Sequence, residues 1–173
     1  MTMKKYVLTL SLLLMCVFAF AGSVKVTKGK TSGFKENANA SISFQWDGAK
    51  WDRGEPLQQH WGNDYERLKQ VGESSFIQGF NEKSKKLMIK EAEGQYRMVV
   101  KIVSLDSFFS VMSFVPGHKH KVDAIITIYE VSTDSLICEI KTDEFEGGRD
   151  FSYDDSYAEC MGDLGKKISK MIK

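Results

Sequence analysis

The feature that most constrains this fold is a succession of three strand-like segments in the second half of the sequence. Residues 95–105 (QYRMVVKIVSL) are rich in β-branched side chains and turn apolar on both faces, which is typical of a strand at the centre of a sheet. Residues 121–131 alternate between apolar and polar side chains, and residues 132–135 (STDS) predict a tight turn into a strand over 136–140. The three segments together predict an antiparallel meander.

Helical and further strand patterns flank this meander. Residues 40–47 alternate like a half-buried strand, and apolar residues recur every three or four positions over 57–87. The latter pattern predicts two amphipathic helices, or one that is interrupted near Gly72. A last helix is expected to begin where Ser152 and Asp155 are spaced as a capping box. We therefore predict an α+β fold: a single domain with a roughly four-stranded mixed sheet and helices packed on one face.

The amino-terminal residues have the pattern of a cleavable secretory signal peptide. Two lysines precede an apolar run over 6–18, and a small-x-small motif ends at Ala21. We predict a signal peptide over 1–21, a flexible leader over 22–39 and the α+β domain over 40–173. The exported domain is expected in the periplasm, at the outer membrane or outside the cell. An uncleaved anchor is the alternative interpretation of the apolar run.

The charge balance bears on the class of partner. The chain has 24 basic and 23 acidic side chains, and two of the lysines lie in the predicted signal peptide. Nucleic-acid-binding proteins usually carry a basic face and a high isoelectric point, so no nucleic-acid partner is expected.

The apolar run over 6–18 is shorter than the roughly 20 residues of a spanning helix. We expect a domain that is peripheral to a membrane at most, with no cofactor.

The cysteines leave two interpretations open. Cys16 would depart with the signal peptide, and Met15 before it does not fit a lipid-attachment motif. Cys138 is expected on the inner face of the sheet and Cys160 on the packing stripe of the last helix. An exported protein can form disulfides, so the two thiols are either bonded to each other or are separate buried apolar groups.

The segment 46–66 (WDGAKWDRGEPLQQHWGNDYE) gathers aromatic and polar side chains. Aromatic rings beside hydrogen-bonding groups suit the binding of glycans or peptides. Trp46 and Trp61 fit the periodicity of a core, and Trp51 alone escapes it. The segment is therefore interpreted mainly as core, with a ligand cradle at Trp51, Asp52 and His60 as the alternative.

His118 and His120 would share one face of a strand, with Asp123 on the opposite face by parity. Two imidazoles can begin a metal site, but zinc sites usually have three or four protein ligands. We expect these residues to lie in a solvated turn after Pro116-Gly117, and we expect no metal.

The segment 105–115 (LDSFFSVMSFV) is strongly apolar for a connection between strands. Phe108 and Phe109 either extend the preceding strand or form an exposed docking surface. Strand extension is the preferred interpretation, and partner docking is the leading functional use, because large exposed apolar patches mark partner sites.

No motif in the sequence identifies a reaction. The serine nucleophile motif Gly-x-Ser-x-Gly is absent, and the carboxylates over 143–155 lie among glycines and before a helix, where acids are usually solvated or capping. We expect no enzymatic activity, with a hydrolase as the least favoured alternative.

Several short strings carry a resemblance to known proteins: residues 80–82 (FNE), 96–102 (YRMVVKI), 136–140 (LICEI) and 164–168 (LGKKI). The layout resembles uncharacterised exported proteins of Bacteroidetes-type bacteria. More distantly, it is similar to the α/β domain shared by the curli-secretion lipoprotein, the TolB amino-terminal domain and lipoprotein activators of penicillin-binding proteins. The resemblance implies a binding or assembly module of the cell envelope whose partner is an envelope protein or a glycan.

Overall fold

A computed structural model of the chain describes residues 22–90, 94–111 and 116–172. The predicted signal peptide lies outside the described residues. In chain order the elements are β1 (Ser23–Gly29), β2 (Ala38–Gln45), β3 (Lys50–Trp51), β4 (Glu55–Pro56), α2 (Leu57–Trp61), the 3-10 turn η2 (Gly62–Asp64), α3 (Tyr65–Lys83), β5 (Leu87–Ile89), β6 (Tyr96–Ser110), β7 (Gly117–Glu130), β8 (Ser135–Asp143), β9 (Phe145–Asp150) and α4 (Tyr153–Met171).

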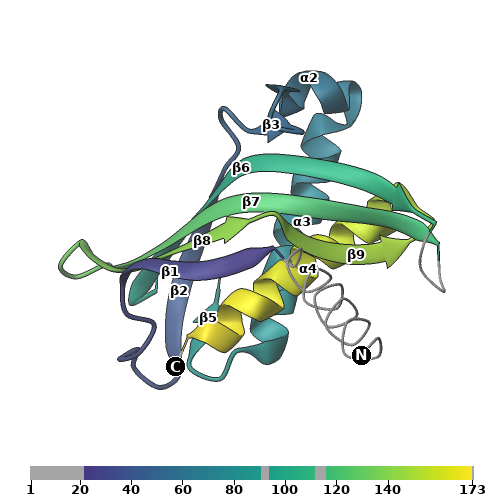
Figure 1. The fold of residues 1–173 in the computed structure, drawn as a ribbon. Helices are drawn as coiled ribbons and strands as arrows, with labels where there is room; N and C mark the ends of the chain where they lie inside the picture. Colours follow the sequence, from purple (N-terminus) through teal and green to yellow (C-terminus); the bar gives the residue numbers. More distant parts are fainter. Residues whose placement is uncertain (1–21, 91–93, 112–115, 173) are drawn as a thin grey trace, which may run out of the picture.

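The strands form one mixed sheet with the order β1-β8-β7-β6-β2-β5 (Figure 1). The β1, β8, β7 and β6 strands pair antiparallel, whereas β2 pairs parallel with both β6 and β5. The prediction of a single α+β domain with a mixed sheet is confirmed. The predicted number of about four strands is wrong, because the described residues alone form a sheet of nine. Strands of two or three residues, such as β3, β4 and β5, are too short to show an alternating pattern.

The centre of the sheet is a long two-stranded ribbon made of β6 and β7. Its register runs from Tyr96 opposite Glu130 to Ser110 opposite Gly117. The ribbon therefore extends well beyond the predicted strands, and the strand extension through Phe108 and Phe109 is confirmed. A bulge between Ile102 and Ser104 shifts the register by one residue. On opposite flanks of this ribbon, β8 is followed by β9 along β7, and β2 is followed by β3 along β6.

One face of the sheet is buried under helices. Along β7, Val122, Ala124, Ile126 and Ile128 are buried, while the residues between them are only half-buried. Such alternation is typical of an antiparallel sheet with one covered face. Figure 1 shows α3 and α4 crossing this side, which we call the helix face. We call the other side the open face; its exposed side chains include Arg97, Lys101 and Lys141.

The helices differ from the prediction at two places. The α3 helix passes through Gly72 without a break. The Tyr157 side chain on α4 occupies the space that a side chain at Gly72 would need, so this glycine allows close packing and does not end a helix. Leu87, which fits the predicted helical stripe, instead belongs to β5. At α4 the Ser152 hydroxyl accepts a hydrogen bond from the amide of Asp155 at 3.3 Å, as the capping pattern predicts.

The first strand occupies part of the predicted leader. Residues 22–39 were expected to be a flexible segment, yet Ser23–Gly29 pairs antiparallel with β8 at the edge of the sheet. Its alternation is short and interrupted by Lys25 and Lys28, which gives it the composition of a linker. Lysine side chains on an edge strand also oppose pairing with another chain. The same lysines therefore make the strand hard to recognise in the sequence and protect its free edge from pairing with another chain.

Candidate functional site

The structure divides the candidate residues between the two faces of the sheet. On the helix face, the rings of Trp51, His118 and His120 lie around that of Tyr153. His60 stacks on Trp51, and Phe109 contacts His118. Asp52 and Phe108 lie on the open face, where Asp52 lines a charged cleft and Phe108 is beside lysines of β7. The sequence predicts one aromatic cradle and one apolar segment. In the structure, residues of both segments instead lie together in a cluster on the helix face, and the others lie on the open face.

The Trp-rich segment is mainly core, as its periodicity predicts. Trp46 and Trp61 are buried, and their indole N–H groups donate to Glu73 at 2.8 Å and to the hydroxyl of Tyr153 at 3.2 Å. Trp51 is half-buried, and one face of its ring is stacked on His60 at 3.9 Å between centroids. Because His60 already covers a face of this indole, the segment offers little free aromatic surface to a sugar ring.

Tyr153 is the centre of the helix-face cluster, and its role could not be recognised from the sequence. The Tyr153 ring lies 4.7 Å from that of His120 and 6.0 Å from that of His118, in edge-to-face geometry. It also lies 6.5 Å from the Trp51 ring. Tyr153 is the first residue of α4, so the start of this helix gathers side chains from β3 and β7. Edge-to-face aromatic pairs of this kind stabilise a fold.

The prediction that His118 and His120 lie in a solvated turn is wrong. Both belong to β7, which begins at Gly117, and the His120 side chain is fully buried on the helix face. Neither ring nitrogen of His120 has a hydrogen-bond partner among the described residues. The pKa of His120 is lowered to about 4, mainly by burial and to a small extent by the neighbouring His118, while the backbone of Tyr153 acts in the opposite direction. The neutral imidazole therefore behaves as a core side chain.

The two cysteines are not bonded to each other. Cys138 and Cys160 are both buried free thiols. Cys138 pairs with Ile128, whereas the Cys160 thiol lies 3.6 Å from the carbonyl oxygen of His120. These two positions on β7 are separated by roughly 25 Å of strand, far more than the roughly 4–7 Å between the Cα atoms of a disulfide. The prediction placed both cysteines on facing inner surfaces correctly but could not locate them at different ends of the sheet.

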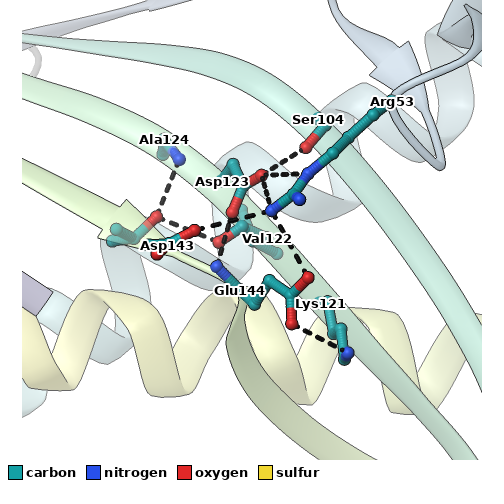
Figure 2. Close-up of polar contacts among 9 residues, drawn as sticks. Arg53, Ser104, Lys121, Val122, Asp123, Ala124, Asp143 and Glu144 are labelled. Carbon is teal, nitrogen blue, oxygen red and sulfur yellow. Dashed lines mark hydrogen bonds and ion pairs between the residues drawn. The ribbon is translucent and has the colours of Figure 1, made fainter. Parts of the chain in front are cut away.

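A small charged cleft of about 60 Å³ opens on the open face beside the β3–β4 hairpin (Figure 2). Asp123 is its centre, and its carboxylate is only 14% exposed. It accepts hydrogen bonds from the Ser104 hydroxyl at 2.7 Å, the Glu144 amide at 2.5 Å and the Arg53 guanidinium at 3.2 and 3.3 Å. The cleft is lined by Asp52, Arg53, Ser104, Asp106, Lys121, Asp123 and Glu144.

Most charged side chains of this cleft are paired with one another. Arg53 also lies 3.5 Å from Asp143 and 3.4 Å from Glu144, and its hydrogen bond to Asp123 raises the pKa of Arg53. Lys121 pairs with Glu144 at 3.1 Å. The cleft therefore ties the β3–β4 hairpin to β7 and to the junction of β8 and β9. Its residues come from separate parts of the chain, so no sequence pattern could assemble them.

Exposed apolar side chains gather at the end of the sheet where β6 finishes and β7 and α4 begin. We call Phe108, Phe109, Val111 and Phe151 the apolar end; they are 36%, 50%, 72% and 65% exposed. Phe109 is opposite His118 on β7, and His118 is in turn opposite Asp150 on β9, next to Phe151. The register therefore brings these residues to one end of three adjacent strands. The remaining apolar residues of the predicted segment, at 112–115, lie outside the described residues.

Within residues 22–90, 94–111 and 116–172, no group of three or more His, Cys, Asp or Glu side chains could hold a metal ion. In the same part of the chain, no helix combines the length and the apolar character that crossing a membrane requires.

No protein-family model matches the sequence, and no curated protein matches it. Among solved structures, the chain is similar to PelC from Paraburkholderia phytofirmans, crystallised as a dodecamer (14% identity, TM-score 0.42, covering 87% of this chain and 97% of that one). It is also similar to the hypothetical protein CT253 from Chlamydia trachomatis (9%, 0.38, 80% and 93%). A third similar structure is protein XCC0632 from Xanthomonas campestris (10%, 0.38, 88% and 94%). These are distant likenesses of fold, and they carry neither a family nor a ligand over to this chain.

Proposed function

We propose that this chain is an exported, non-enzymatic module that docks on a component of the bacterial cell envelope through its apolar end. The carrying observation is the exposure of Phe109, Val111 and Phe151 at adjoining strand ends. A single exposed apolar side chain is ordinary on a protein surface, whereas a cluster of them marks a contact site.

The opposite end of the same ribbon supports this assignment by contrast. There the turn between β7 and β8 has three polar residues after Val131, and Asp134 pairs with Arg97 at 2.7 Å. The large apolar side chains exposed at this end are those of Val131 and Leu136, which are 53% and 38% exposed. Two ends of one ribbon, alike in backbone, thus differ in polarity, and the apolar one is the better docking surface.

The non-enzymatic part of the proposal is supported by how the reactive groups are placed. Burial raises the pKa of the Cys138 thiol to about 11 and also raises the pKa of Cys160, which disfavours the thiolate that a nucleophile requires. His120 is enclosed by aromatic rings, and Asp123 is saturated with hydrogen bonds. Export rests on the signal-like sequence of residues 1–21.

Sedimentation with washed envelope fractions of a Bacteroidetes-type bacterium tests the proposal. We expect residues 22–173 to sediment with the envelopes and the variant Phe109→Asp to remain largely in the supernatant, because a carboxylate cannot enter an apolar contact without a desolvation cost. The matched control is Val131→Asp, which places the same charge on an equally exposed residue at the polar end.

The control variant is expected to sediment like the wild type. Equal sedimentation of Phe109→Asp and wild type would show that the apolar end is not the docking surface. Thermal melts of all three proteins exclude misfolding as the cause of any loss.

A further inference from the structure

The apolar end has exposed rings on both faces of the ribbon. Consecutive residues of a strand point to opposite sides, so Phe108 lies on the open face and Phe109 on the helix face. Their neighbours agree: Phe108 has Lys121 near its ring at 5.6 Å, and Phe109 contacts the ring of His118 at 5.2 Å. A flat partner would meet only one of these faces, whereas a medium that surrounds the end of the ribbon would contact both.

The part of β6 that enters the apolar end has no charged side chain. Asp106 is its last charged residue, and residues 107–111 have none. On the neighbouring strands, the charged residues level with them are Lys119, opposite Phe108, and Asp150, opposite His118. An uncharged strand end with charges at its sides matches the boundary between lipid hydrocarbon and headgroups, where apolar and aromatic side chains insert shallowly.

The charged groups beside the Phe108 ring are lysines of β7. Lys119 and Lys121 lie 6.0 and 5.6 Å from the Phe108 ring, and each ammonium is paired with a glutamate. A protein pocket deep enough to enclose both faces would have to bury these ion pairs, which costs free energy. Lysines at a bilayer surface keep their charged ends in water while their stems lie along apolar groups.

We propose that the envelope component is the lipid surface itself, and that the apolar end inserts into the interfacial layer of a bilayer. This inference rests on the docking function proposed above and names its partner. Phe151 and Val111 widen the inserting end beyond the two phenylalanines of β6, since β9 lies beside β7. Insertion depends on apolar surface, so it requires no anionic headgroup.

Sedimentation with sucrose-loaded vesicles of pure phosphatidylcholine tests the inference without any envelope protein present. We expect residues 22–173 to bind these vesicles, and Val111→Asp and Phe151→Asp each to weaken the partition by at least about tenfold, the effect of removing one large apolar side chain from its buried state. Binding is expected to persist at high salt, because it is not driven by charge. Val131→Asp is the matched control and is expected to bind like wild type.

The results separate this inference from the proposed function. The wild-type protein could fail to bind the vesicles and still sediment with envelopes, with Phe109→Asp reducing that sedimentation. In that case the lipid inference is wrong and a protein or glycan is the partner. If neither vesicles nor envelopes retain the protein, both proposals fail. Equal loss with Val131→Asp and Val111→Asp would also overturn the inference, since it would show no preference for the apolar end.

Discussion

At the scale of single residues, the helix-face core contains two polar side chains without a hydrogen-bond partner among the described residues. They are the imidazole of His120 and the hydroxyl of Tyr157, whose rings lie 5.6 Å apart. A buried polar group that makes no hydrogen bond costs about 1–3 kcal/mol. Each of these groups therefore weakens the fold, and in the acid range the cost of the imidazole depends on pH.

His120 is expected to make the protein sensitive to mild acid. Its pKa is about 4 in the folded protein and 6.5 when the side chain is unperturbed, so protonation favours the unfolded chain. The stability present above pH 6.5 is lost as the pH falls toward 4, by about 3 kcal/mol in total. The groups facing His120 are His118, Tyr153, Tyr157 and the Cys160 thiol.

Urea unfolding of the wild type and of His120→Phe between pH 7 and 4 measures this effect. We expect the variant to lose clearly less stability than the wild type over this range. Tyr157→Phe is the comparison, because it removes the other unpartnered group without changing a titration; it is expected to be more stable by about 1 kcal/mol at every pH. Parallel curves for wild type and His120→Phe would exclude His120 as the acid-sensitive group.

At the scale of elements, α3 and α4 cross at facing glycines. A Cβ atom at Gly79 would lie 2.0 Å from the carbonyl oxygen of Gly162, so the two backbones are in direct contact. In the reverse direction, a Cβ atom at Gly162 would lie 3.5 Å from the carbonyl oxygen of Ser75, an ordinary van der Waals contact. At this pair of positions the crossing therefore needs glycine at residue 79 but not at residue 162. Farther along α4 a glycine is needed at residue 165, where a Cβ atom would lie 2.2 Å from the carbonyl oxygen of Phe76.

The two alanine substitutions at this crossing are expected to have opposite effects. Gly79→Ala forces the helices apart and should lower the free energy of unfolding by about 2–3 kcal/mol. Gly162→Ala keeps the contact and gains helix propensity, so it should be neutral or more stable by up to about 1 kcal/mol. Chemical denaturation of both variants provides the check, and similar values for the two would contradict the close backbone contact.

At the scale of the whole molecule, the sequence predicts what depends on regular periodicity. The β6–β7–β8 meander, the helix at α4 and the core positions of Trp46 and Trp61 follow from patterns within one element. What it does not predict depends on contacts between distant segments. Examples are the pairing of β1 with β8 and the assembly of the cleft around Asp123.

The same limitation explains the misjudged histidines. Whether residue 120 faces solvent or core depends on how far β7 extends and on whether Tyr153 of α4 packs against its side chain. Neither is visible in the residues near the Pro116-Gly117 turn. A pattern confined to one segment can thus predict that two imidazoles share a face, but not which layer that face meets.

A prediction at the scale of the whole molecule concerns export and cleavage of the signal peptide. When expressed with its own amino terminus in a Gram-negative host, the protein is expected to leave the cytoplasm and to begin at Gly22, and Ala21→Lys is expected to block this processing. The intact mass of the purified protein measures the cleavage position. Recovery of the full 173-residue mass from the cytoplasm would refute the signal peptide.

The pairing of β1 with β8 has a consequence for the timing of maturation. Thr27 on β1 binds Glu139, which follows 112 positions later. In the export proposed above, this edge can therefore close only after nearly all of the polypeptide has crossed the inner membrane. Gly22 itself lies against the backbone of Glu144, with no room there for a side chain. A peptidase acting after Ala21 would find its substrate accessible only while β1 is still unpaired. The late closure of this edge leaves that interval open during translocation, so we expect cleavage to precede the final step of folding.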